Sequence, residues 1–282
     1  MEFQVQDIRT WSEFTDFVCS LSGEWAYRGQ THDWPLRTSL ERALNNWEVD
    51  LAEGPDVERQ IIRDFRRRYR GEAEYRVNSD TLFCLALMQH YGAPTRLLDW
   101  TYSPFVAAKF ALETGAKDGV VWCMNTAWCH QAAVEVAGSE AIAARNVDSS
   151  RGDVSFRPLY IGDDGARRKF VMAENPMQLN ERLIIQQGVF MCPGDVAAGF
   201  VENLQAMTGW DSRNNLIKIR FNLERNEAVR FVVTLRRMNV DSGVLFPGLD
   251  GFARSLGERL PLYVDLARRM IGTENFKTGS TI

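Results

Sequence analysis

The sequence predicts an α+β fold with a helical N-terminal part. Segments with helical spacing of apolar residues dominate the first part of the chain, whereas short apolar segments typical of strands cluster around the second half. The 282 residues are 45% hydrophobic and 25% charged, which is typical of a globular protein with a sizeable core. Because neither an internal repeat nor a low-complexity linker interrupts the chain, we expect a single domain over residues 1–282.

Apolar spacing and local start and stop signals predict the elements of the first half. Gly23 ends a first amphipathic helix, and "EWAYRGQ" follows as a short strand. Thr38 or Ser39 provides an N-cap for the next helix, and Gly92 with Pro94 stops a more apolar one. The elements expected here are, in order, helix 7–21, strand 24–30, helix 38–47, helix 56–76 and helix 81–92.

In the second half of the chain, the expected helices and strands alternate less regularly. Ser103 and Pro104 suit the N-cap and the first position of a helix. Residues 131–178 are mixed and polar, and we expect an insertion there. The valines in 226–240 make a strand a rival of the amphipathic helix expected there. The other expected elements are strand 95–101, helix 103–113, strands 119–125, 182–192 and 215–223, and a turn at 245–256 that leads into a last helix.

Composition narrows the function classes. A net charge of -4 argues against a generic binder of nucleic acids or membranes, although a local basic stripe is compatible with it. No apolar run approaches the length of a membrane span, and the N-terminus does not resemble a signal peptide, so we expect a cytoplasmic protein. The five cysteines are interpreted as reduced, buried thiols. The segment Cys123–His130 lacks a second ligand cluster, and we predict no metal site.

An arginine followed by a glycine marks the strand "AYRGQ". The Arg28 guanidinium suits bidentate contact with a phosphate or a carboxylate, and the absent side chain of Gly29 would let a ligand approach the backbone. The alternative interpretation is a structural arginine that pairs with a carboxylate such as Asp99.

A second polar cluster lies in "QHYGAPTRLLDWTYSPFVAAKFALE", residues 89–113. Helix capping explains Ser103, but it does not explain His90, Arg96 and Asp99. Alternation along the strand would turn Asp99, Thr101 and Ser103 to one side. This cluster is a candidate binding site.

A third feature is the arginine-rich segment "RDFRRRYR", residues 63–70. If it is helical, we expect its arginines to spread around the helix as a solvated surface paired with nearby acids. The alternative is a contact for RNA or for an acidic protein.

Four blocks resemble the FRG domain, a family named for its Phe/Tyr-Arg-Gly motif and seen largely in bacteria and their phages. The blocks are "WAYRGQTHDWPLRTSLER", "QHYGAPTRLLDWTYSPFVAAKFAL", "NERLIIQQGVF" and "VLFPGLDGFARSL", and they follow the family's order. The chain is identified as a member of this family on that combination. The family name implies no activity.

The chain is more distantly similar to ADP-ribosyltransferases of the Arg-Ser-Glu class. Arg28 and Gly29 are similar to the arginine of that class's first core strand, and Thr101 and Ser103 stand in the serine positions. In the third element Arg182 occupies the position of the expected glutamate, and Glu181 lies one residue away. Gln187 is another polar candidate on that segment.

This resemblance implies an ADP-ribosyltransferase-like core with a central antiparallel sheet, and NAD as co-substrate. Glu181, Thr101 and Ser103 would be catalytic, and the expected NAD-binding residues are Arg28, Gly29, His90, Tyr91, Arg96, Asp99 and Gln187. Asp99 is a candidate substitute carboxylate, and Tyr91, Trp100 or Tyr102 would stack on nicotinamide.

Three functions follow from the two sites and the resemblance. The leading one is ADP-ribosylation of a protein or RNA acceptor by a bacterial or phage-related toxin or defence effector, for which an antitoxin-like partner is a candidate. The alternative is a non-catalytic module that recognises a nucleotide, a nucleic acid or a protein partner. A third hypothesis is a hydrolase that uses Asp99 and His90 as acid and base, which requires both on one pocket wall.

Overall fold

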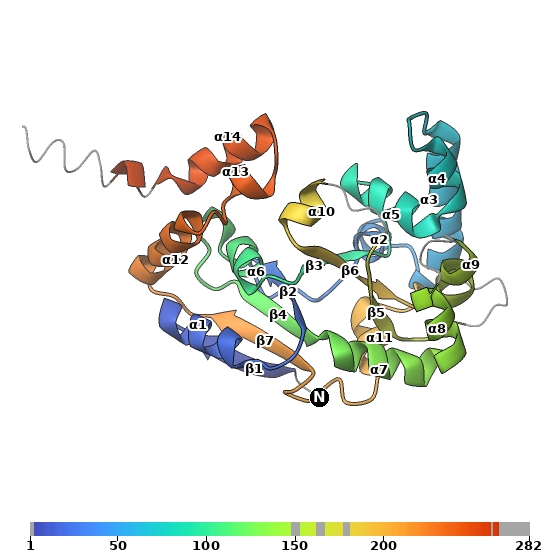
Figure 1. Cartoon of the computed structure of the whole chain (residues 1–282), viewed down its shortest axis with the longest axis horizontal. Coiled ribbons are helices and arrows are strands. Elements are labelled where there is room, and N and C mark those ends of the chain that lie inside the picture. The colour runs from blue at the N-terminus through green and yellow to red at the C-terminus, as the bar shows by residue number, and fades with distance from the viewer. Residues whose placement is uncertain (1–2, 148–152, 162–166, 177–180, 261, 265–282) are drawn as a thin grey trace, which may run out of the picture.

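The computed structural model describes residues 3–147, 153–161, 167–176, 181–260 and 262–264. Its centre is a seven-stranded mixed sheet with the order β1-β7-β4-β2-β3-β6-β5 (Figure 1). The strands are β1 (Gln4–Ile8), β2 (Trp25–Gln30), β3 (Leu98–Thr101), β4 (Val120–Asn125), β5 (Val171–Glu174), β6 (Gly188–Pro193) and β7 (Leu216–Phe221). The predicted α+β class is confirmed.

Helices cover both faces of this sheet (Figure 1). The main helices before β4 are α1 (Trp11–Ser20), α2 (Ser39–Asn46), α3 (Gly54–Arg68), α4 (Glu74–Ser79), α5 (Thr81–His90) and α6 (Pro104–Ala111). Those after β4 are α7 (Thr126–Ala137), α8 (Ser139–Val147), α9 (Asp153–Phe156), α10 (Glu181–Ile185), α11 (Phe200–Gln205), α12 (Arg225–Arg237), α13 (Ser242–Leu245) and α14 (Leu249–Glu258). A π-helical turn, Arg157–Ile161, follows α9.

Alternation along the central strands divides the core into two clusters. Tyr27 and Val121 face one cluster together with α1, α6 and α12. Ala26 and Trp122 face the other, which is formed with α5, α7 and α11. Each strand residue points to the face opposite to that of its neighbour, so the same strands bury two apolar layers.

The sheet is divided at its middle. Strand β2 pairs with β4 along its whole length, but it pairs with β3 through one residue pair, Tyr27 with Thr101. Strand β3 then continues with β6 from Leu98 to Thr101. The two halves of the sheet therefore meet at one point and diverge beside it.

Local signals placed several elements correctly. Thr38 accepts a hydrogen bond from the backbone of Glu41 as the N-cap of α2, and Ser103 caps α6 in the same way at Val106. Gly92 has a φ of 82° and terminates the segment after α5, as its position predicts. Residues 225–237 form helix α12 and not the rival strand.

The N-terminal prediction was wrong in part. Residues 4–8 form a strand, so the helix begins at Trp11 and not at Asp7. Strand β1 pairs in parallel with β7, whereas every other neighbouring pair is antiparallel. The sheet is consequently mixed rather than purely antiparallel, because an edge strand from the N-terminus joins β7.

Two further segments differ from their expectations. The long helix over 56–76 stops at Arg68, and α4 begins at Glu74. The strand over 182–192 is a helix, α10, followed by β6 from Gly188. Gln187 connects them with a φ of 48°, a left-handed conformation that neither element could contain.

The insertion expected at 131–178 is integrated into the fold. It contributes part of α7 and the edge strand β5, which pairs with β6. Residues 148–152, 162–166 and 177–178 of this range lie outside the described residues. None of the helices within the described ranges combines the length and the apolar composition that crossing a bilayer requires.

Candidate functional site

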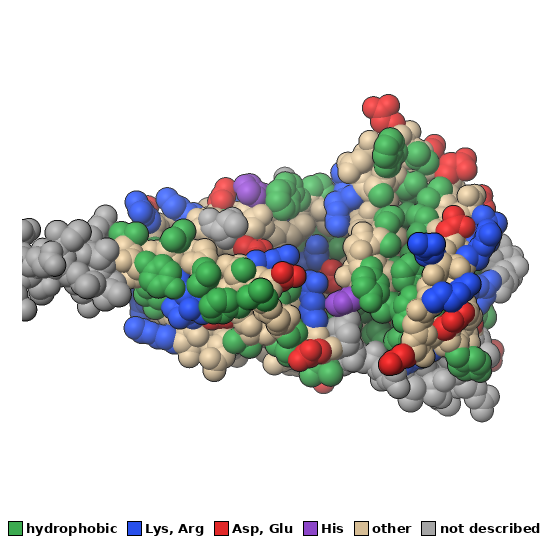
Figure 2. Space-filling view, turned by 90° about the horizontal axis from the view of Figure 1, so that it is seen from above, with side chains coloured by type: hydrophobic (Ala, Val, Ile, Leu, Met, Phe, Trp, Pro, Cys, Tyr) green, Lys and Arg blue, Asp and Glu red, His purple; other side chains and the backbone are tan. Residues whose placement is uncertain are grey.

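A large cavity opens where β2 and β3 diverge. Its volume is about 640 Å³, and it is bordered by β2, the segment after β2, α2, β3, α6 and α10. Seen from above, the molecule is hollowed near its middle, and basic side chains line the hollow (Figure 2). The polar lining residues are Arg28, Gln30, Thr31, Arg37, Arg42, Asn45, Asn46, Asp99, Thr101, Glu113, Arg182 and Gln186.

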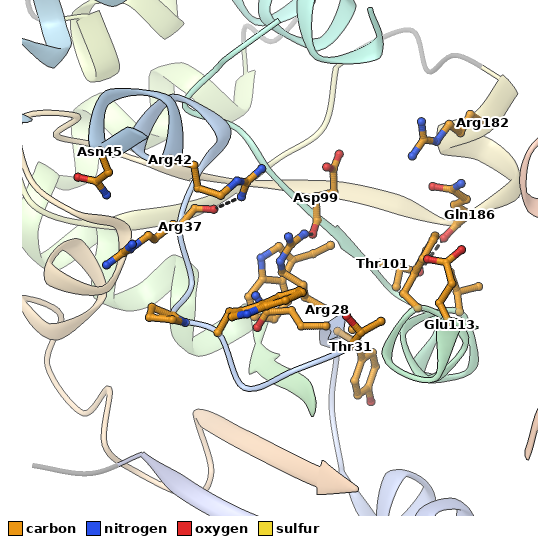
Figure 3. Close-up of a pocket in the computed structure, with 18 of the residues that line it drawn as sticks. Arg28, Thr31, Arg37, Arg42, Asn45, Asp99, Thr101, Glu113, Arg182 and Gln186 are labelled. Carbon is orange, nitrogen blue, oxygen red and sulfur yellow. Dashed lines mark hydrogen bonds between the residues drawn. The ribbon is translucent and has the colours of Figure 1, made fainter. Parts of the chain in front are cut away.

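Arg28 occupies the centre of this cavity (Figure 3). Its Nη1 donates to the backbone oxygen of Asp99 at 2.5 Å, which satisfies a carbonyl that β2 does not reach because the strands have diverged. Its Nε is buried and has no hydrogen-bond partner among the described residues. Burial lowers the pKa of the Arg28 guanidinium to about 10, so the group stays charged at neutral pH in a place that disfavours its charge.

Trp100 adds a second unsatisfied donor. The side chain lines the cavity and is 3% exposed, and its indole N–H has no partner among the described residues. Burying a donor without an acceptor costs free energy. A ligand rich in acceptor oxygens would satisfy such groups. At this exposure Trp100 does not offer an open face for stacking, contrary to the sequence-based expectation.

Basic residues surround Arg28. Arg42 donates from Nη1 to the backbone oxygen of Arg37 at 2.7 Å, which holds the Arg42 side chain at the α2 end of the cavity (Figure 3). The Arg37 guanidinium lies 3.7 Å from Glu41. Arg182 stands at the opposite end on α10. Four arginines thus line a cavity whose acidic residues are Asp99 and Glu113, and the positive excess favours an anionic ligand.

The carboxylate of Asp99 is available. No hydrogen bond or ion pair reaches it from the described residues, although its negative charge partly offsets the effect of burial on the pKa of Arg28. Glu113, in contrast, pairs with the buried Lys109 at 3.0 Å. His90 and Asp99 both line a smaller neighbouring cavity of about 60 Å³, which meets the geometric requirement stated for an acid and base pair.

The hydroxyl-bearing strand exit contributes one residue to the cavity. Thr101 donates to the backbone oxygen of Gln186 at 2.6 Å and accepts from the backbone of Ser103 at 3.0 Å. These bonds join β3 to the segment after α10. Ser103 is not among the cavity residues, and its hydroxyl caps α6.

Gly29 serves packing. A Cβ built on it would lie 1.9 Å from the backbone oxygen of Ala107, so only glycine lets α6 pack this closely on β2. The expectation that the missing side chain admits a ligand is therefore corrected: the space is occupied by α6.

Arg96 is structural. It is 1% exposed and forms a bidentate ion pair with Glu58, with 2.7 Å between Nε and Oε1. Its Nη1 also donates to the backbone oxygens of Tyr160 and Pro193. With its donors occupied in the interior, Arg96 cannot contact a ligand in the cavity, and its assignment to NAD binding was wrong.

The residues predicted near the third motif lie outside the main cavity. Glu181 is exposed at the start of α10, and Gln187 is exposed after it. Arg182, which occupies the position expected for a glutamate, does line the cavity. Tyr91 is 68% exposed at the end of α5, away from the cavity lining.

Sequence reasoning did not single out several cavity residues. Trp34, Arg37 and Arg42 all lie in the block "WAYRGQTHDWPLRTSLER" that follows the Arg-Gly pair. Trp34 is 55% exposed and stacks on His32, with 4.9 Å between the ring centroids. The sequence did contain a signal for these residues, since Trp34 lies between Arg28, an arginine suited to a phosphate, and the helix capped by Thr38. Among the described residues, no group of His, Cys, Asp and Glu side chains is arranged to hold a metal ion.

Comparison with protein families gives a match to the FRG domain over residues 23–119. This segment contains Arg28, Arg42, Asp99, Thr101 and Glu113, and so most of the cavity wall. The sheet also requires strands from both sides of the segment, and a domain spanning 1–282 stays a prediction. No match to a curated protein or to a solved structure was found. On this match, residues 23–119 of the chain carry an FRG domain.

Proposed function

We propose that the protein binds NAD in the cavity between β2 and β3 and transfers ADP-ribose to a macromolecular acceptor, a protein or an RNA. The observation that carries the proposal is the Arg28 guanidinium, which is charged, partly satisfied and placed on the wall of a basic cavity. A diphosphate would supply the acceptor oxygens and the negative charge that this group lacks.

The size and charge of the cavity are compatible with a dinucleotide. Its volume of about 640 Å³ lies within the range of ligand pockets. Arg37 and Arg42 extend the positive region from Arg28 toward α2 (Figure 3). Trp34 offers an exposed ring at the same side on which a planar base would stack.

Asp99 is the proposed catalytic carboxylate. In the reaction the bond between C1′ of the ribose and the nicotinamide nitrogen breaks, and its electron pair leaves with nicotinamide. The positive charge that builds on the ribose is stabilised by a nearby carboxylate, as in other glycoside cleavages. The acceptor nucleophile then forms a bond to C1′ and loses a proton.

The carboxylate of Asp99 lies on the cavity wall without a hydrogen-bond partner among the described residues, which supports this catalytic role. The sequence resemblance had assigned the role to Glu181.

The experiment separates binding from turnover. Titration calorimetry measures NAD binding, and chromatography measures nicotinamide released by protein incubated with NAD and a cell extract. We expect micromolar binding, release of nicotinamide and transfer of a radiolabel from the adenylate part of NAD to an extract component. Asp99→Asn should retain binding and lose at least about 100-fold of nicotinamide release, as the loss of transition-state charge stabilisation requires.

Glu181→Gln is the matched control, since that side chain is exposed outside the cavity. It should keep both binding and turnover. Loss of turnover in Glu181→Gln together with full activity in Asp99→Asn would reverse the assignment. Absence of NAD binding by folded protein would refute the proposal.

The second candidate is a non-catalytic nucleotide-binding module. It is favoured by Arg182, which lines the cavity where the resemblance requires a glutamate. Under this alternative NAD or ADP-ribose raises the melting temperature but is recovered unchanged. A hydrolase that uses His90 and Asp99 would instead consume NAD without labelling an acceptor.

The biological role that we propose with this chemistry is that of a bacterial or phage-related toxin or defence effector, held in check by an antitoxin-like partner. Induced expression in a bacterial host should slow growth, and expression of Asp99→Asn to the same level should not. Equal growth with both proteins would argue against a toxic transferase.

A further inference from the structure

A second concave site lies on the flank of α3, apart from the cavity that we assign to NAD. It is a groove of about 460 Å³, formed by α3, the segment that follows it, α4 and the turn after α9. Ile62 and Ile161 provide its apolar part, and Glu74 is the acidic residue among its lining. Six arginines line it: Arg59, Arg63, Arg66, Arg67, Arg70 and Arg157. Basic and acidic side chains are interspersed at the right end of the molecule in Figure 2.

The arginines of α3 form a stripe. Arg59, Arg63, Arg66 and Arg70 follow the spacing i, i+4, i+7 and i+11, which places them on one side of a helix, although Arg70 lies just beyond its end. The expected spread around the helix holds for Arg68, the groove arginines share one side, and the expected pairing with nearby acids is confirmed for Arg63 and Arg70. Arg68, which does not fit this spacing, is not among the lining residues.

One arginine of the stripe has a structural role. Arg66 donates from Nε to the backbone oxygen of Val77 and from Nη2 to the hydroxyl of Thr81, both at 2.9 Å. It also lies 3.6 Å from Asp153. These contacts bind α3 to α4, α5 and α9, and they fix the base of the groove.

The other three arginines of the stripe, and Arg67 beside them, are available to a ligand. Arg59, Arg63 and Arg70 form exposed ion pairs with acids close in sequence, such as the 3.3 Å contact between Arg70 and Glu74. Exposed pairs of this type contribute at most about 1 kcal/mol, so a polyanion displaces them at low cost. Arg67 is exposed and has no ion pair with a described residue.

We infer that this groove binds the phosphodiester backbone of a single-stranded nucleic acid. The stripe from Arg59 to Arg70 extends over about 16 Å, so it can contact several consecutive phosphates, and each guanidinium can bind a phosphate bidentately. The groove also offers Asn78 for hydrogen bonds to bases. Tyr75 follows Glu74 in α4, outside the groove lining itself, and it is 85% exposed, so its ring is open for a base to stack on. An acidic protein would use the charges but not the exposed ring.

The test uses fluorescence anisotropy of a labelled uridine RNA of about 15 nucleotides, without NAD, between about 50 and 400 mM salt. Contacts from Arg59, Arg63, Arg67 and Arg70 predict that log K falls with log salt with a slope of about -3. Arg63→Gln combined with Arg67→Gln should weaken binding at least about tenfold at low salt and reduce the slope by about 1.4. Tyr75→Ala should weaken binding with the slope unchanged.

The matched control is Arg225→Gln combined with Arg237→Gln, which removes the same charge from exposed positions on α12. This control should bind RNA like the wild type. The inference is overturned if RNA does not bind at low salt, or if both double variants weaken binding equally. It is also overturned if a polyglutamate peptide displaces RNA at equal charge concentration, since the groove would then serve an acidic protein.

Discussion

Arg28 donates its 2.5 Å hydrogen bond to the backbone oxygen of Asp99 and not to the carboxylate of that residue. The arginine thus replaces the ladder hydrogen bond that is missing where β2 and β3 diverge, and the carboxylate remains available. One side chain both joins the two halves of the sheet and lines the cavity between them. If Arg28 is replaced, water can donate a hydrogen bond to the Asp99 carbonyl, but nothing replaces the positive charge that would hold an anionic ligand. The contributions of Arg28 to stability and to binding can therefore be measured separately.

Replacement of Arg28 by methionine should weaken ligand binding strongly with little loss of stability. The variant removes a buried charge with an unsatisfied Nε, and this gain offsets the lost hydrogen bond to Asp99. We expect the free energy of unfolding to change by less than about 1 kcal/mol, and the Kd for ADP-ribose to rise roughly 10- to 100-fold. Urea denaturation and calorimetry measure the two quantities.

Arg225→Met on the exposed start of α12 provides the control for a lost positive charge. It should leave the Kd within about twofold, because the distant charge is screened. A strongly destabilised Arg28→Met that binds ADP-ribose normally would mean that Arg28 only joins the strands.

Gly29→Ala should destabilise the protein through packing and not through ligand exclusion. The added Cβ would lie 1.9 Å from the backbone oxygen of Ala107 and 2.7 Å from the backbone nitrogen of Ala111, so α6 must move away from β2. We expect a loss of about 3 kcal/mol or more in the free energy of unfolding. Thermal and urea denaturation measure this loss.

Gly257→Ala is the matched control, since a Cβ at that position in α14 meets no atom within 4 Å. It should stabilise the protein by up to about 1 kcal/mol, as alanine favours a helix over glycine. Equal stability of the two variants would contradict the close packing of α6 on β2.

The elements that the sequence predicted well have local causes. The caps Thr38 and Ser103 and the left-handed Gly92 act within a few residues of their own position, so the chain alone specifies them. Strand β1 was missed because it is an edge strand held by β7, more than two hundred residues away. The segment 182–187 carries apolar residues that suit a strand or a helix, and only the surrounding fold decides between them.

The part of the site that lies on the paired strands β2 and β3 could be predicted from the sequence. Tyr27 pairs with Thr101, so Arg28 and the strand exit meet as expected. Arg37 and Arg42 could not be assigned, because their position depends on how the start of α2 packs against Thr95 in the segment before β3. Arg96 was misassigned since nothing local shows that its partner, Glu58, is buried 38 positions earlier. A sequence distinguishes types of residue, but it does not show which arginine is already neutralised.

The ion pair between Arg96 and Glu58 should behave as a buried structural unit. Burial lowers the pKa of the Arg96 guanidinium, but the carboxylate of Glu58 outweighs burial and raises this pKa above its usual range, so Arg96 stays charged at every pH at which the protein folds. Arg96→Met should cost about 3–5 kcal/mol because it leaves Glu58 buried without its cation. Arg96→Met combined with Glu58→Leu should recover most of this loss.

Urea denaturation of the single and double variants completes this cycle. If Arg96→Met kept full stability while ADP-ribose binding disappeared, Arg96 would be a ligand-binding residue and not a structural one. The double variant is the control for folding, because it removes the buried charge of Glu58 as well and does not bring back the guanidinium donors of Arg96.

The native protein should expose one reactive thiol. Cys19 is exposed, and the other four cysteines are buried. Burial raises the pKa of the Cys84 thiol to about 11 and that of Cys129 to about 12, and it raises the pKa of Cys123 further. Since only a thiolate attacks a disulfide reagent, these thiols should stay unreactive when the pH is raised from about 7 to about 9.

Titration with a chromogenic disulfide should count one thiol in the native protein and all five after unfolding. Cys19→Ser should remove the native reaction entirely, and several fast thiols in that variant would show that the core opens far more readily than this burial implies.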